Sequence, residues 1–461
     1  MNTRRLSDVA AATQGRLLGA DREFGRVVQD TRKLGQGDLF VAIKGEHYDG
    51  HDFISQAERQ GAAGAMVARR TTSKLAQVQV EDTRLALGAY AAHWRRRFDL
   101  PLVGVTGSNG KTTVKEMLAS ILRQRGATLA TRGNMNNDIG MPLTLLELET
   151  THRAAVIEMG TNHPGEIAYL ARLAAPTVGV VTNAGPAHLE FLVDIDGVAR
   201  EKGALFACLA EDGTAVINAD DPHAAQWREV AGRRRVYTFG FSEQADFRPL
   251  PRLLEPTAGG GWHFHLVCPA GEADVAVSLP GRHNVANALA AAAGAIAAGA
   301  TLAEVRAGLA EAPATSGRLI PGEGWNGSRL IDDTYNANPL SLRAAMEYAV
   351  ALGGRTWLVL GDMGELGNTA ETLHKECGVE ARSLGIERLF SLGPMSRHAA
   401  DAFGTGARWF DELGLLVRTL QAELGPGVTL LVKGSRSMRM ERVVEALKPQ
   451  PAAGRAANGD H

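Results

Sequence analysis

A glycine-rich turn that follows an apolar run gives the clearest chemical signal in this chain. Residues 107–113 have the sequence GSNGKTT and follow the apolar run at 102–106. Glycines let backbone N–H groups close around phosphate oxygens, and the positive end of a following helix attracts the same anion. Lys111 supplies a full charge to the β- and γ-phosphates, and the Thr112 hydroxyl is a ligand for Mg²⁺. The turn therefore predicts a triphosphate site made by Gly107, Ser108, Asn109, Gly110, Lys111, Thr112 and Thr113.

The turn departs from the usual P-loop spacing at one position, because Val105 stands where that pattern has glycine. The alternative interpretation is a strand-to-helix turn that is merely rich in small residues. A buried strand, a glycine turn, a Lys–Thr pair and a helix occur together here, which favours nucleotide binding. Kinases, switches, motors and ligases all use such loops, so the motif predicts the ligand and leaves the reaction open.

Polar residues also follow two neighbouring predicted strands. Glu158 ends the apolar run that begins at Ala154, and His188 follows the run VGVVT. Carboxyl ends of strands face the ligand crevice in an open α/β sheet, so Glu158 is well placed to bind Mg²⁺ beside ATP. The alternatives are a surface glutamate and a structural histidine.

Other polar residues give weaker signals. Lys202 lies on a predicted helix at 196–209, where the residues alone favour a solvated side chain. His263 and His265 form an HxH pair on an alternating strand and are interpreted as one exposed face, since no third metal ligand stands out.

An α/β chain of several domains must position these residues. The chain has 461 residues, too many for one hydrophobic core. Residues 1–98 form a first block, 99–312 a second and 313–450 a third, with a linker at 312–318. The small, polar, proline-bearing tail at 451–461 is expected to be disordered.

Local patterns predict the architecture of the second and third blocks. Short apolar runs alternate with helices in the second block, which predicts a mainly parallel, helix-covered sheet. Residues 262–267 and 274–279 alternate in polarity and predict an antiparallel appendage. The third block alternates strand and helix signals again, which predicts an open, doubly wound α/β domain. The basic stretch at 93–98 is expected to be the solvated last turn of a helix.

The composition excludes several classes of protein. A formal net charge of −2 gives no basic field for nucleic acid. Three widely spaced cysteines fit neither a disulfide framework nor a metal site, and are expected to be reduced thiols. The N-terminus lacks the apolar stretch of a secretory signal, and the alanine-rich run at 288–300 is too short to span a bilayer. We therefore expect a cytoplasmic protein without a membrane span.

At this point the chain resembles the Mur ligases. The resemblance is ordered, spans nearly the whole chain and rests on TGSNGKTT (106–113), GNMNNDIG (133–140), EMG (158–160), NAGPAHLE (183–190), GRHNVANALAA (281–291), SGR (316–318), DDTYNANP (332–339), GDMGELG (361–367) and KGSR (433–436). Residues 30–53 resemble the N-terminal UDP-binding domain of the later ligases. YNANP and GDMGELG are typical of the member that adds D-alanyl-D-alanine.

The resemblance implies a fold and an activity. It implies three domains: an N-terminal α/β nucleotide-sugar-binding domain, a central P-loop ATPase-like parallel sheet and a C-terminal Rossmann-like domain that contacts ATP and the amine. The implied enzyme is a monomer that uses ATP and two Mg²⁺ ions. It adds D-alanyl-D-alanine to UDP-N-acetylmuramoyl-tripeptide through an acyl phosphate, in peptidoglycan synthesis for cell wall biogenesis, cell shape and division.

The resemblance also implies roles for individual residues. Lys111, Glu158, His188 and Lys202 are the catalytic set; Thr112 and Glu158 bind one Mg²⁺, and His188 binds a second with Lys202 as a carbamate. Asn287 and Arg318 approach the adenine and phosphates, and Asp333 the ribose. The implied substrate-binding residues are Thr31, Arg32, Lys44, Asn136, Asn137 and Asn162, with Asn336, Asn338 and Asp362 on the dipeptide side. Ala204 departs from the family, which often has glutamate at that position.

Three alternatives remain open at this stage. The nearest is another amide ligase of the same fold, such as the diaminopimelate-adding Mur ligase or a folylpolyglutamate synthase. A phosphotransferase would stop at a phosphorylated product. A nucleotide-binding module would show no turnover.

Overall fold

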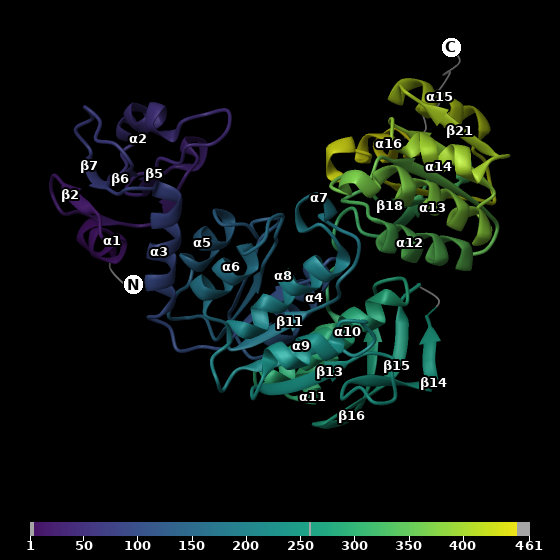
Figure 1. Ribbon diagram of the computed structural model, residues 1–461, viewed down its shortest axis with the longest axis horizontal. Helices are drawn as coiled ribbons and strands as arrows, with labels where there is room; N and C mark the ends of the chain where they lie inside the picture. Colours follow the sequence, from purple (N-terminus) through teal and green to yellow (C-terminus); the bar gives the residue numbers. More distant parts are fainter. Residues whose placement is uncertain (1–3, 258–259, 450–461) are drawn as a thin grey trace, which may run out of the picture.

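Three α/β parts follow one another along the chain (Figure 1). The computed structural model describes residues 4–257 and 260–449, so the expected disordered tail lies outside the described residues. The purple N-terminal part lies at one end, the blue and teal central part in the middle, and the green and yellow C-terminal part at the other end. Each part contains its own sheet with parallel strands, which confirms the predicted α/β fold with three parts.

The N-terminal part is built on a sheet with the strand order β2-β7-β6-β5-β4, parallel except for the β2–β7 pair. A small β1–β3 pair lies beside it. Its elements are β1 (Arg4–Arg5), α1 (Leu6–Thr13), β2 (Arg16–Leu18), β3 (Glu23–Phe24), β4 (Val27–Val28), η1 (Thr31–Lys33), β5 (Leu39–Val41), η2 (Gly50–Phe53), α2 (Ile54–Arg59), β6 (Gly64–Val67), β7 (Ala76–Gln79) and α3 (Thr83–Arg95).

Helix α3 ends differently from the prediction. Asp82 caps its start by accepting from the backbone N–H groups of Arg84 and Leu85. Near its end, Arg95 is buried and donates to the carbonyl oxygens of Ala174 (3.0 Å) and Leu100 (3.2 Å). The prediction of a solvated basic turn was therefore wrong for this residue, because carbonyl groups of the central part replace water around its guanidinium.

The central part holds a parallel sheet with the order β13-β12-β11-β8-β10-β9. Its elements are β8 (Leu102–Thr106), α4 (Lys111–Arg123), β9 (Thr128–Ala130), α5 (Gly140–Leu145), β10 (Ala154–Glu158), α6 (Glu166–Ala174), β11 (Val178–Val181), α7 (Leu189–Leu192), α8 (Ile195–Ala207), β12 (Thr214–Asn218), α9 (Ala224–Ala231) and β13 (Arg235–Phe239). Strand β8 lies between β10 and β11. The loops after these three strands therefore meet at one edge of the sheet, where the strand order reverses and ligands commonly bind.

The expected antiparallel appendage is present. It consists of β14 (Arg248–Pro256), β15 (Trp262–Cys268) and β16 (Gly271–Val277), and is followed by α10 (His283–Ala297) and α11 (Leu302–Ala310). On β15, His263 is exposed and His265 contacts Asp274 and Glu272. Within the described residues, no helix has the length and apolar character needed to cross a bilayer.

The C-terminal sheet has the order β17-β18-β22-β19-β20-β21, with only the β17–β18 pair antiparallel. Its elements are β17 (Ile320–Glu323), η3 (Trp325–Gly327), β18 (Arg329–Asp333), α12 (Pro339–Ala351), β19 (Arg355–Gly361), η4 (Gly367–Thr369), α13 (Ala370–Ser383), β20 (Arg388–Leu392), α14 (Ser396–Phe403), β21 (Ala407–Phe410), α15 (Leu413–Glu423), β22 (Val428–Lys433), η5 (Arg436–Met438) and α16 (Glu441–Ala446). The expected doubly wound arrangement is thus observed; α14, β21 and α15 had not been predicted.

The N-terminal and central parts share a hydrophobic core, whereas the C-terminal part has cores of its own. One continuous core joins the N-terminal and central parts, with Tyr90 and Trp94 of α3 in the same cluster as Met141 of α5 and Ile167 of α6. A second core covers the other face of the central sheet. The two cores of the C-terminal part contain residues of that part alone.

Candidate active site

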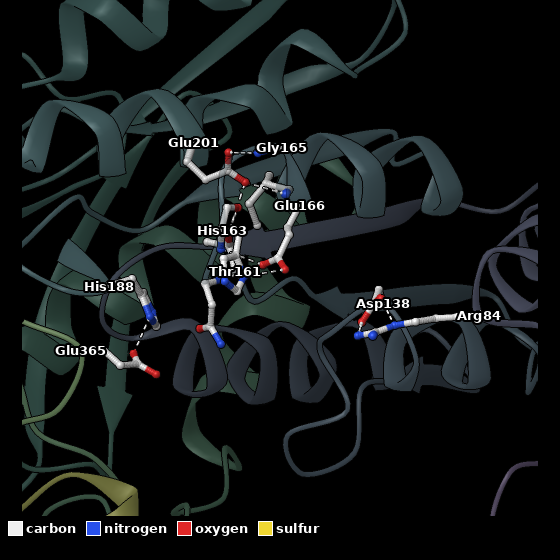
Figure 2. A network of polar contacts seen from close by, with 11 residues as sticks. Arg84, Asp138, Thr161, His163, Gly165, Glu166, His188, Glu201 and Glu365 are labelled. Atoms are coloured by element: carbon white, nitrogen blue, oxygen red, sulfur yellow. Dashed lines mark hydrogen bonds and ion pairs between the residues drawn. The ribbon is translucent and has the colours of Figure 1, made fainter. Parts of the chain in front are cut away.

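A cavity of about 710 Å³ lies at the carboxyl edge of the central sheet. All three parts line it: Arg84 comes from α3, the phosphate loop and Glu158 from the central part, and Asn336 and Glu365 from the C-terminal part. Figure 2 shows polar contacts along it, from the His188–Glu365 pair to the Arg84–Asp138 pair. The cavity is therefore large enough to receive several ligand groups at once.

The phosphate loop requires glycine at two positions. Gly107 and Gly110 have φ angles of +150° and +81°. A Cβ atom at Gly107 would collide with Thr182, and one at Gly110 would collide with Asn287. Only glycine fits at these two positions without a shift of its neighbours. The loop backbone therefore has no side chain there to cover it, as a phosphate cradle requires.

The loop that follows strand β11 holds the phosphate loop in place. Ser108 exchanges hydrogen bonds with the backbone of Gly185, at 3.1 and 3.0 Å. Asn109 donates its N–H to Asn183 Oδ1 (2.9 Å), and its carbonyl accepts from Thr182 (2.6 Å). The loop is thus positioned by hydrogen bonds from the segment that leads to His188.

Lys111 begins helix α4 and is turned back over the loop. Its Nζ donates to the carbonyl oxygens of Gly107 (2.7 Å) and Ser108 (3.3 Å). Burial lowers the pKa of Lys111, and the nearby Glu158 carboxylate opposes that shift. The ammonium is therefore partly shielded from water, and its attraction for an anion is stronger there than in bulk water.

Glu158 is buried at the end of β10, with 2% of its surface exposed. Its N–H donates to Thr131 Oγ1 (2.9 Å), and its Oε1 accepts from Asn136 Nδ2 (2.8 Å). Its Oε2 is buried and has no hydrogen-bond partner among the described residues. An orphaned carboxylate oxygen in a polar cavity is an available ligand for a cation.

His188 lies across the cavity in a left-handed backbone conformation, with φ of +58°. Its Nδ1 lies 2.6 Å from Glu365 Oε2, although without the angle of a regular hydrogen bond. Burial lowers the pKa of His188. The imidazole is therefore neutral at pH 7, as metal coordination requires.

Lys202 is buried on α8, with 1% of its surface exposed. Burial lowers its pKa well below the ordinary value, and Lys111 adds to that shift by repulsion. The preceding residue, Glu201, accepts from the backbone N–H groups of Gly165 and Ile167, both at 2.7 Å, and so fixes the start of α6 (Figure 2). The interpretation of Lys202 as a solvated lysine was wrong, because this helix face packs inside the protein.

The residues implied for the nucleoside gather at the other side of the phosphate loop. Asn287 on α10 is buried and donates to Asn284 (2.8 Å). Asp333 pairs with the buried Lys433 at 2.5 Å. Arg318 stacks on Tyr335 and donates from Nη2 to Thr112 Oγ1 (3.1 Å). All of these side chains except Thr112 line the cavity.

The end of the cavity nearest the N-terminal part is rich in amides and charges. Asn137 and Asn162 line it, and Arg84 Nη2 donates to Asp138 Oδ1 at 2.7 Å (Figure 2). Glu166 accepts from the backbone N–H groups of Asn162 (2.7 Å) and of His163. The amide and charged groups at this end can therefore contact a polar, extended ligand.

Four predicted substrate residues lie outside the cavity lining. Thr31, Arg32 and Lys44 belong to the N-terminal part; Thr31 is buried, Arg32 pairs with Asp30, and Lys44 is exposed. Asp362 accepts from the backbone N–H of Ser396 (2.7 Å), at the start of α14. That contact gives Asp362 a structural role here.

The two amides of YNANP do line the cavity. Asn336 Oδ1 accepts from the N–H of Ala337 (2.9 Å), and Asn338 caps α12. Asn338 Nδ2 also donates to Asn109 Oδ1 (2.7 Å), so it contacts the phosphate loop.

Several cavity residues were missed from the sequence. Glu365 and Lys433 belong to the motifs GDMGELG and KGSR, which carried the resemblance without a role for these two side chains. Asp138 likewise belongs to the motif GNMNNDIG without an assigned role, and Arg84 gave no signal, since only the fold pairs it with Asp138.

Comparisons with known proteins agree with the resemblance. Family models match three stretches: the Mur ligase middle domain at residues 105–295, the Mur ligase glutamate ligase domain at 317–436, and the Mur ligase family catalytic domain at 26–95. The UDP-N-acetylmuramoyl-tripeptide–D-alanyl-D-alanine ligase of Escherichia coli (strain K12) is 45% identical over 445 residues, which cover 96% of this chain and 98% of that protein.

Solved structures show the same likeness. A crystal structure of MurF from Acinetobacter baumannii has a TM-score of 0.91 and 36% identity, and covers 96% of this chain and 98% of that one. MurF ligase from Thermotoga maritima, in complex with ADP, has a TM-score of 0.82 and 30% identity, and covers 91% of this chain and 96% of that one.

Proposed function

Because the chain belongs to the Mur ligase family, we propose that it is an ATP-dependent ligase that joins D-alanyl-D-alanine to UDP-N-acetylmuramoyl-tripeptide. That is the reaction for which its Escherichia coli relative is named. The observation that carries the proposal is Lys111, which is turned back over the phosphate loop and shares one cavity with the orphaned carboxylate oxygen of Glu158. The reaction belongs to the synthesis of peptidoglycan precursors in the cytoplasm.

The chemistry must first make a carboxylate reactive. An oxygen of the donor's terminal carboxylate attacks the γ-phosphorus of ATP, the bond from that phosphorus to ADP breaks, and an acyl phosphate forms. The amine of the dipeptide then attacks the acyl carbon, the bond from that carbon to phosphate breaks, and the amine loses its proton. Lys111 stabilises the charge on the phosphoryl oxygens during the first step, which is the main contribution of a protein to such transfers.

The donor set fits Mg²⁺. Thr112 Oγ1 and the orphaned Oε2 of Glu158 are hard oxygen ligands, and His188 offers a neutral nitrogen. Among the described residues, no group of three or more His, Cys, Asp or Glu side chains is arranged around a metal site. Mg²⁺ is commonly held by one or two carboxylates together with substrate phosphates, so this sparse set suits it. When bound, Mg²⁺ offsets negative charge on the phosphates.

We propose that Lys202 carries a carbamate. Its neutral amine would attack CO₂, the new N–C bond would form as a C–O π bond opens, and the nitrogen would lose a proton. Burial and the repulsion by Lys111 favour the neutral amine that this step needs. The product replaces a cation with an anion that has two oxygen ligands for a second Mg²⁺.

The C-terminal part is proposed to protect the acyl phosphate from water. Among the described residues, three polar side-chain contacts join it to the central part: Arg318 to Thr112, Asn338 to Asn109, and Glu365 to His188. All three involve polar groups that a bound nucleotide or metal would also contact. These contacts support the proposal that the C-terminal part closes over bound ligands and opens to release product.

The function is tested by phosphate release with ATP and UDP-N-acetylmuramoyl-tripeptide, with and without D-alanyl-D-alanine. Steady release that depends on the dipeptide supports the ligase. Phosphate release without any acceptor would instead favour a hydrolase, and ADP release without free phosphate would favour a phosphotransferase. Release of neither product would leave a binding module. A preference for diaminopimelate or glutamate as acceptor would favour another ligase of the same fold.

A further inference from the structure

The carboxylates that line the cavity differ in which groups compensate their negative charge. Five acidic residues line it: Asp138, Glu158, Glu166, Asp333 and Glu365. Asp138 pairs with Arg84, and Asp333 pairs with Lys433. Glu166 accepts from two backbone N–H groups, and Glu158 lies 2% exposed beside Asn136. Each of these four therefore has either a formal partner or a place in the proposed metal site.

Glu365 is the exception within the described residues. Its side chain remains 43% exposed, and its contact is with His188 Nδ1, at 2.6 Å but without the angle of a regular hydrogen bond. No lysine or arginine is paired with it among the described ion pairs, although the attraction of Lys111 reaches it. It is thus a carboxylate that faces both the cavity and the reacting end of the nucleotide site.

The backbone around Glu365 holds it in this position. Its φ angle is +62°, a left-handed conformation that costs free energy in a residue with a side chain. Its carbonyl oxygen accepts from the N–H of Glu190 (3.2 Å), in the helix that follows His188. The strain is therefore maintained by a contact between the C-terminal and central parts, as is common where strain serves a function.

We propose that Glu365 binds the ammonium group of the incoming dipeptide and positions its nitrogen beside the acyl carbon. This inference rests on the proposed function. ATP and the donor carboxylate bring only negative charge to this end of the cavity, so a carboxylate there opposes their binding. The ammonium of the acceptor has a charge that matches Glu365, and it is the charged substrate amine that must reach the acyl phosphate. Glu365, rather than Asp362, is then the acidic residue of GDMGELG that determines acceptor binding.

Glu365→Gln tests the proposal, because it removes the charge and keeps the shape. The variant should raise KM for D-alanyl-D-alanine by roughly 10- to 100-fold, the size expected for one charge-assisted hydrogen bond. Acyl phosphate formation should change less than about threefold, since the first step does not use the acceptor. Hydroxylamine measures that step, because it is a small, largely uncharged nucleophile at neutral pH that captures acyl phosphates as hydroxamates.

Two further variants separate binding from structure. Glu365→Asp keeps the charge and should recover part of the affinity for the dipeptide. Glu190→Gln removes an exposed carboxylate beside the same contact and should leave KM unchanged. The melting temperature of each variant shows whether it is folded.

Three results would overturn the proposal. One is an unchanged KM for the dipeptide in folded Glu365→Gln. Another is an equal loss of hydroxamate formation and of dipeptide coupling, which would make the residue a structural contact between the parts. The third is a higher Mg²⁺ requirement with an unchanged KM for the dipeptide, which would make it a metal ligand. A wild-type protein that couples no dipeptide would refute the proposed function itself.

Discussion

Replacement of Lys111 by alanine separates catalysis from stability. In the folded protein Lys111 is half-buried, and its ammonium donates to two loop carbonyls, at 2.7 and 3.3 Å. Burying an ammonium costs several kcal/mol, which its hydrogen bonds approximately offset. The variant should therefore melt within about 4 °C of the wild type.

The effect on turnover should be much larger. One neutral hydrogen-bond donor to a transition-state oxygen contributes about 3–4 kcal/mol, or roughly 10²–10³ in rate. Lys111 supplies a full charge that is partly shielded from water, so at least about 10³ in kcat should be lost.

The assay is dipeptide-dependent phosphate release, with melting followed by circular dichroism. Lys115→Ala is the matched control, since Lys115 is buried on the same helix but donates to Thr131 (2.8 Å) and Glu116 (2.5 Å). The control should lower stability and keep kcat within about tenfold at low temperature. A folded Lys111→Ala enzyme that turns over within tenfold of the wild type would refute the assignment of the phosphate site.

Three other outcomes are expected. Lys202→Ala should be nearly inactive, with partial recovery in added acetate; full activity would exclude the carbamate. Small-angle scattering should show compaction when an ATP analogue and the donor bind, since the segment at 313–316 has no buried side chain; identical profiles would contradict a moving C-terminal part. Burial raises the pKa of Tyr90 to about 12 from 10.0, so the folded state favours the protonated phenol. Its contribution to stability is complete below about pH 10 and is lost as pH rises to about 12, and Tyr90→Phe should reduce this loss by up to about 2 kcal/mol in urea unfolding at pH 8 and 11; equal losses in both proteins would refute it.

Local patterns were sufficient where a site is contiguous or lies at strand ends. Residues 107–113 form one turn, so composition and spacing reveal it. Glu158 and His188 follow strands β10 and β11, which flank β8, and parallel strands bring their carboxyl ends to one edge. The sheet itself therefore gathers these residues.

Local patterns failed where irregular backbone decides the direction of a side chain. Asp362 and Glu365 are three residues apart in one loop, and the loop has no periodicity to show that Glu365 faces the cavity. Arg95 and Lys202 have ordinary surface chemistry, yet both are buried. The carbonyl group of Ala174, from a distant segment, helps to compensate Arg95, and such long-range pairing leaves no trace in the local sequence.

The core shared by the N-terminal and central parts has a consequence for where recombination can join parts of related enzymes. A recombination point near residue 98 would separate α3 from the side chains that it packs against, and would expose apolar surface on both fragments. A recombination point at 313–316 would leave the cores on both sides intact. We therefore expect C-terminal parts to be exchangeable between relatives, whereas the N-terminal part is expected to be inherited together with the central part that holds the phosphate loop.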